Sequence, residues 1–108
     1  MDIQNKFLSL FVKIDKLNID YKNNLIPENE IRDIKNYWED FDEDIKIALK
    51  HIDSISDDGK KSLDGNLTEL LLLRANLIDL TRYFEDARML IENVCIKIDE
   101  EENKTHLE

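Results

Sequence analysis

Hydrophobic residues recur at alternating intervals of three and four along most of the chain, and this spacing limits the fold more than any other feature. In the first segment, over 2–22, the series is Ile3, Phe7, Leu10, Ile14, Leu17 and Tyr21. Such intervals place every member on one face of an α-helix. Asn23-Asn24 and Pro27 then interrupt the pattern, so we expect the first helix to end near residue 22 and the next to start near 27.

Two further segments repeat the pattern. Over 27–54 the series is Ile31, Ile34, Trp38, Phe41, Ile45, Ala48 and Ile52. Over 66–101 it is Leu70, Leu73, Leu77, Leu80, Phe84, Ala87, Ile91, Val94 and Ile98. We therefore predict an all-α fold, an antiparallel three-helix bundle with a long third helix. Asn66 and Glu69 are spaced as a capping box at its start.

The third segment leaves one alternative open. A break near residues 80–82, with Thr81 capping a new helix, would give a four-helix bundle instead. We predict one helical domain over 1–103 and a disordered tail over 104–108, in which Leu107-Glu108 has the form of a cloning remnant.

Composition narrows the function classes. A net charge of −10 disfavours direct binding to nucleic acid or to an anionic membrane and favours a protein partner with a basic surface. One cysteine excludes an internal disulfide, and no apolar stretch has the length of a signal peptide or membrane span, so we expect a cytoplasmic protein. The many Ile, Asn and Lys codons are typical of a low-GC bacterium or its phage.

The densest charged cluster lies in the second segment and is the first candidate binding site. Five acids surround Phe41 there: Glu39, Asp40, Asp42, Glu43 and Asp44. Like charges four residues apart repel in a helix, so their retention suggests a patch that docks a basic partner. The alternative is a solvated face, neutralised in part by Arg74 and Arg82 of the third helix, and this alternative is favoured for Glu39 and Glu43.

The second candidate surface comes from helix lengths. Counting outward from the Gly59 region places Glu28 opposite Ile91, so about ten residues of the third helix, roughly 15 Å, extend past their neighbours. Val94, Cys95 and Ile98 lie in this stretch. We predict that they contact a second copy or a different protein, against the alternatives of fraying or of a bend back onto the first helix.

Catalysis has little support in the sequence. Glu39-Asp40-x-x-Glu43 loosely resembles the first half of the metal-binding motif of MazG-type pyrophosphatases, but the second half is missing. Neither histidine has a ligand partner at zinc spacing. We predict no enzyme, no metal and no cofactor. The expected function is a small acidic protein-binding module of the inhibitor, immunity or anti-defence type, with a self-associating structural adaptor as alternative and a metal-dependent phosphohydrolase as the least favoured.

Overall fold

The computed structural model describes residues 2–22 and 25–107, together with the side chains up to residue 103. Within that part the chain forms four helices, α1 (Asp2–Asp20), α2 (Glu28–Trp38), α3 (Phe41–Ser54) and α4 (Leu63–Leu107), and no strand. The predicted all-α class and the long final helix are confirmed. Glu108 and the side chains of 104–107 lie outside the described part, so the disorder predicted for 104–108 stays a prediction.

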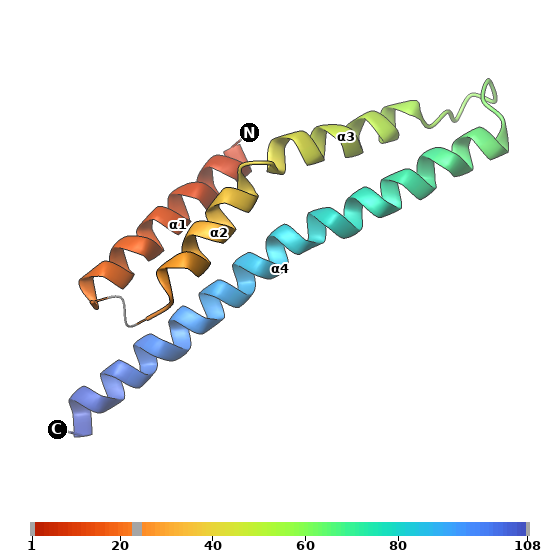
Figure 1. The fold of residues 1–108 in the computed structure, drawn as a ribbon. Helices are drawn as coiled ribbons and strands as arrows, with labels where there is room; N and C mark the ends of the chain where they lie inside the picture. The colour runs from red at the N-terminus through yellow and green to blue at the C-terminus, as the bar shows by residue number, and fades with distance from the viewer. Residues whose placement is uncertain (1, 23–24, 108) are drawn as a thin grey trace.

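The molecule is a rod. Its principal extents are 71 × 21 × 19 Å, and its radius of gyration is 19.7 Å, against about 13 Å for a compact chain of this length. α4 runs the whole length, since 45 residues at 1.5 Å each span roughly 67 Å. In Figure 1, α1 and α2 pack beside its C-terminal half, and α3 alone accompanies its N-terminal half.

The predicted second helix, 27–54, is wrong in one respect, because a turn at Glu39–Asp40 divides it into α2 and α3. The backbone N–H groups of Glu39 and Asp40 bond to carbonyls three residues back, which tightens the end of α2. The side-chain amide of Gln4, on α1, donates to the carbonyls of Trp38 and Glu39, each at 3.0 Å. These bonds satisfy carbonyl groups that the interruption frees.

The alternative break near 80–82 is wrong, because α4 is continuous there. The hydroxyl of Thr81 donates to the carbonyl of Leu77, one turn back in the same helix, at 2.8 Å. The predicted capping box at Asn66 is also wrong. α4 begins at Leu63, where the Ser62 hydroxyl accepts a bond from the N–H of Gly65. Asn66 instead bonds both backbone groups of Ser56 and ties the loop to the helix.

The core lies mainly where three helices meet. Its largest fully buried side chains are Trp38, Tyr83, Phe11, Phe41, Leu90 and Asn18. The Trp38 ring stacks on Phe7 and Phe41, with centroids 4.3 and 4.9 Å away, and its indole N–H donates to the carbonyl of Tyr83. Because these groups come from α1, α2, α3 and α4, the aromatic cluster joins all four helices at the α2–α3 turn.

A buried asparagine shapes the α1–α2 connection. The Asn18 side chain accepts bonds from the N–H groups of Leu25 and Ile26 and donates to the carbonyl of Ile26 at 2.8 Å. Leu25 and Ile26 are thereby held in the core, with 3 % and 2 % of their surfaces exposed. The connection is therefore packed hydrophobic structure as well as a turn.

Candidate protein-binding surfaces

The five acids predicted as a docking patch surround the α2–α3 turn and do not form one surface. Glu39 and Asp40 occupy the turn itself and are exposed, as is Glu43. Asp42 and Asp44 are half-buried. Among the described residues, neither Glu39 nor Glu43 forms an ion pair with Arg74 or Arg82, so the predicted neutralisation by these arginines is absent.

The turn supplies a structural reason for the acidic cluster. Asp42, Glu43 and Asp44 form the first turn of α3, where negative charge interacts favourably with the helix dipole. Asp44 also accepts a hydrogen bond from the hydroxyl of Tyr83. Burial, and then this bond to a carboxylate, raise the pKa of Tyr83 above its ordinary value. Part of the cluster therefore stabilises α3 and its packing on α4.

The helix-length argument for Val94, Cys95 and Ile98 rests on a wrong premise. Val94 is 6 % exposed and belongs to the core, and Ile98 packs partly buried against it. The α1–α2 connection lies beside this level of α4, where Leu25 and Ile26 share a groove with Asn93 and Ile96. Cys95 is exposed. A binding role for these three residues stays a prediction, but the uncovered stripe that motivated it lies at the other end of α4.

That other end is the arm, which we define as α3 together with residues 63–80 of α4. One side of the arm holds an internally bonded polar cluster, although exposed Ile47 and Leu72 also lie on it. His51 contacts Glu69 at 2.7 Å, and Lys61 lies 3.6 Å from the same carboxylate. The hydrogen bond from His51, and then the charge of Lys61, hold the pKa of Glu69 below its ordinary value.

The opposite side of the arm is apolar. On α3, Asp44 and His51 lie to one side of buried Ala48, so Ile45 and Ile52, three residues before and four after it, lie to the other. On α4, Glu69 lies to one side of Leu73, and Leu70 and Leu77 lie to the other. Because His51 bonds Glu69 and Asp44 bonds Tyr83, the two polar sides coincide, and so do the two apolar sides.

We call this second side the apolar flank. Its members extend along both helices, and five of the six are about half exposed: Ile45, Leu49 and Ile52 on α3, and Leu67, Leu70 and Leu77 on α4. Ile45 is the exception and is partly buried. Sequence reasoning assigned Leu70 and Leu77 to the core, because their spacing continues that of true core positions.

The same stripe of α4 is only partly covered in the other half of the molecule, where Phe84 and Ile91 are still 44 % and 38 % exposed. Phe84 and Ile91 follow Leu77 at seven-residue intervals and so continue the stripe toward the C-terminus. There Phe7 of α1 packs edge-on against Phe84, with ring centroids 5.8 Å apart, and lines a small hollow with Phe84 and Ile91. The N-terminal end of α1 lies level with the α2–α3 turn, so beyond this turn α3 and α4 continue without a third helix (Figure 1).

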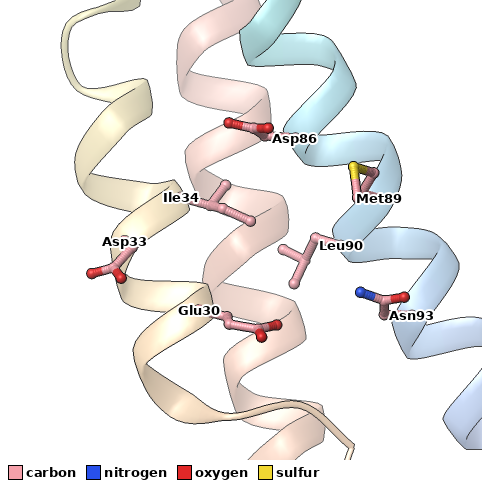
Figure 2. Close-up of a pocket in the computed structure, with 7 residues that line it drawn as sticks. All are labelled: Glu30, Asp33, Ile34, Asp86, Met89, Leu90 and Asn93. Atoms are coloured by element: carbon pink, nitrogen blue, oxygen red, sulfur yellow. The ribbon is translucent and has the colours of Figure 1, made fainter.

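A groove of about 310 Å³ lies between α2 and the C-terminal half of α4 and is shown in Figure 2. Ile34 and Leu90 form its apolar floor between the helices, and Glu30 and Asp86 stand near its edges, while Asp33 points away from α4. Over the part of the chain that the structure describes, no group of three or more His, Cys, Asp or Glu side chains is arranged to hold a metal ion.

No protein-family model, curated protein or solved structure matches the chain. Within residues 2–22 and 25–107, no helix combines the length and the apolar content that crossing a bilayer requires. The candidate surfaces must therefore be judged on their own geometry, which favours the apolar flank over the acids around the α2–α3 turn.

Proposed function

We propose that this chain is a non-catalytic, structural protein-binding module that packs the apolar flank of its arm against helices of a protein partner. The exposure of this flank carries the proposal. Leu70 and Leu77 are 49 % and 50 % exposed, and no helix of the described chain packs on their side of α4, whereas Phe7 of α1 packs against Phe84 on the same stripe. Contiguous apolar surface of several hundred Å² is uncommon on monomers and usually marks an interaction site.

The arm has the form of an incomplete helical bundle. Two antiparallel helices can bury only the seam between them, and most helical stability in proteins comes from burying an amphipathic face against neighbours. In the arm, full burial is limited to Phe41, Ala48 and Leu80. A partner helix laid along the flank would supply the layer that α1 supplies in the other half.

A photo-crosslinking amino acid in place of Leu70 tests this proposal in cells that produce the protein. We expect covalent adducts with a protein, either a second copy or a different chain. The matched control places the same amino acid at Ile19, an exposed apolar residue of α1 outside the flank, and should give few adducts. Equal yields at the two positions, or no adduct from position 70, would contradict the proposal.

A second candidate function keeps the docking role of the acids. Glu39, Asp40 and Glu43 are exposed around one turn, and this supports attraction of a partner with a basic surface, as an inhibitor or immunity protein would need. Such binding weakens as salt rises, whereas apolar packing does not. Partner binding measured at about 50 mM and 500 mM salt separates the candidates: a large loss at high salt favours the acids.

A further inference from the structure

We infer that the occupant of the apolar flank is the flank of a second copy of this chain, with the two arms antiparallel, so that two α3–α4 hairpins close into one four-helix bundle. This inference rests on the proposed function and specifies its partner. Each arm consists of two helices, and a four-helix bundle needs two more, which a second arm would provide.

The shape of the uncovered surface fits a helical hairpin. α3 has 14 residues, or roughly 21 Å, and residues 63–80 of α4 extend roughly 27 Å. The flank spans both helices and is apolar except for exposed Arg74, which lies between Leu70 and Leu77, so a two-helix partner matches its width and length. A single added helix would cover only the groove between α3 and α4 and leave Leu49 and Leu67 exposed at its edges.

A two-fold pairing also satisfies the apolar pattern of both partners. In such an interface the same patch is used twice, so a surface rich in Leu and Ile meets an identical one. A stable interface buries at least about 1,000 Å² in total, or about 500 Å² from each copy. Half-exposed side chains at Leu49, Ile52, Leu67, Leu70 and Leu77, with the surfaces between them, supply an area of this order.

The position of α1 decides the direction of pairing. α1 lies on the flank side of α4, and its N-terminal end lies where the arm begins, as the contact of Phe7 with Phe84 shows. Parallel arms would bring the two α1 helices to the same level and force them into the same space. Antiparallel arms instead point the tip of each copy toward the N-terminal end of the other copy's α1.

Charge opposes the pairing only weakly and predicts its salt dependence. Each copy carries a net charge of −10, so two copies repel at long range. The flank carries one charged side chain, exposed Arg74, among its apolar residues, and added salt screens the repulsion between the rest of the two surfaces. The dimer should therefore hold or strengthen as salt rises, opposite to docking by the acids.

Sedimentation equilibrium of the full chain, from about 1 to 500 µM, tests the pairing. We expect a concentration-dependent shift from the monomer of 12.8 kDa toward twice that mass. Leu77→Glu should raise the dissociation constant at least about 100-fold with unchanged helical circular dichroism, because each dimer would bury two added carboxylates against an apolar surface. Ile19→Glu makes the same chemical change outside the flank and should leave the constant within about threefold. A monomer at every concentration, or a Leu77→Glu dimer as tight as the unaltered one, would overturn the inference.

The distance between spin labels attached to the single cysteine of each copy tests the direction of pairing. Cys95 lies about 23 residues, or roughly 35 Å, from the middle of the arm, so spin labels on the two copies should be roughly 70 Å apart in an antiparallel dimer. A distance below about 30 Å would indicate parallel arms or pairing through the C-terminal half of α4, and would overturn the antiparallel assignment. If the chain is monomeric but crosslinks through position 70 to a different protein, this inference fails and the proposed function stands.

Discussion

The two halves of α4 carry the same apolar spacing but have different surroundings. Around the C-terminal half, α1 and α2 bury Tyr83, Ala87, Leu90 and Val94 to 6 % exposure or less. Around the N-terminal half, α3 is the sole described neighbour, and Leu70, Leu77 and Ile78 are about half exposed. Part of the difference comes from α4 itself. The positions fourteen residues before these four core residues, which share their face of the helix, are Glu69, Leu73, Asn76 and Leu80.

The comparison shows that helix length determines how much of α4 each of the other helices accompanies. α1 has 19 residues and lies antiparallel to α2, so its N-terminal end lies at the α2–α3 turn and it does not reach α3's far end. α3 then continues for 14 residues beyond it. The unpaired length of this rod is therefore at the Gly59 end, where the uncovered residues are strongly apolar. The predictions below test whether the two halves differ in stability as their burial implies.

The largest expected effect is from truncation of the aromatic cluster. Trp38 is fully buried, so Trp38→Ala should lower the free energy of unfolding by about 3–5 kcal/mol. Leu49→Ala in the arm, where the side chain is about half exposed, should cost less than about 1 kcal/mol in the monomer. Urea denaturation of both variants at low concentration checks the contrast. Similar losses at the two sites would show that the halves do not differ in packing.

The next effect concerns the α1–α2 connection. Asn18→Ala leaves two buried N–H groups and one carbonyl without their partner and should cost about 2–3 kcal/mol. The control, Asn36→Ala, removes an exposed amide from α2 and should change the free energy of unfolding by less than about 0.5 kcal/mol. An Asn18→Ala variant as stable as the control would mean that the connection is held by apolar packing alone.

As the pH is lowered, amide protection should fall at the α3–α4 loop before it falls in the half of the molecule where α1, α2 and α4 pack together. The pKa of Glu69 is lowered in the folded chain, so its contribution to stability is present above the ordinary value of 4.5 and is lost as pH falls through the folded pKa. Amide protection factors for residues 50–70, corrected for intrinsic exchange, should fall over this range. Glu69→Gln should remove this pH dependence. An unchanged profile in that variant would assign the loosening to other carboxylates.

The smallest effect tests the structural explanation of the acids. Glu43→Gln removes one charge from the first turn of α3 and should cost about 0.3–1 kcal/mol at low salt, less at high salt. Asp79→Asn makes the same change of charge within α4, away from its ends, and should have a smaller effect. Thermal unfolding at two salt concentrations measures both. A stabilised Glu43→Gln variant would indicate that repulsion among the acids outweighs the helix dipole.

The sequence was sufficient for the helical class and for the long final helix, because both follow from local apolar spacing. It could not indicate the turn at Glu39–Asp40, since Ile34, Trp38, Phe41 and Ile45 keep their spacing across it. The bonds that satisfy this turn come from Gln4, about 35 residues away in the chain. The acids around Phe41 were therefore interpreted as a docking patch on one continuous helix, whereas three of them form the first turn of α3.

The candidate surface was misplaced for a related reason. The count of residues from the Gly59 loop predicted that the C-terminal end of the long helix extends past its neighbours. The first helix is shorter than the second segment, and that count did not include the difference. It also treated the α1–α2 connection as a simple turn, although Asn18 draws Leu25 and Ile26 into the core near Val94. Leu77 and Phe84 share a heptad position and have similar exposure, 50 % and 44 %, but Phe7 of α1 packs against Phe84.

Hydrogen exchange followed by mass spectrometry over a dilution series tests the central claim most directly, because it reads both halves of α4 in one sample. Protection of residues 83–98 should not change with concentration, since α1 and α2 of the same chain cover them. Protection of residues 45–80 should rise several-fold as concentration passes the dissociation constant of the dimer. Equal and concentration-independent protection in both halves would contradict the account.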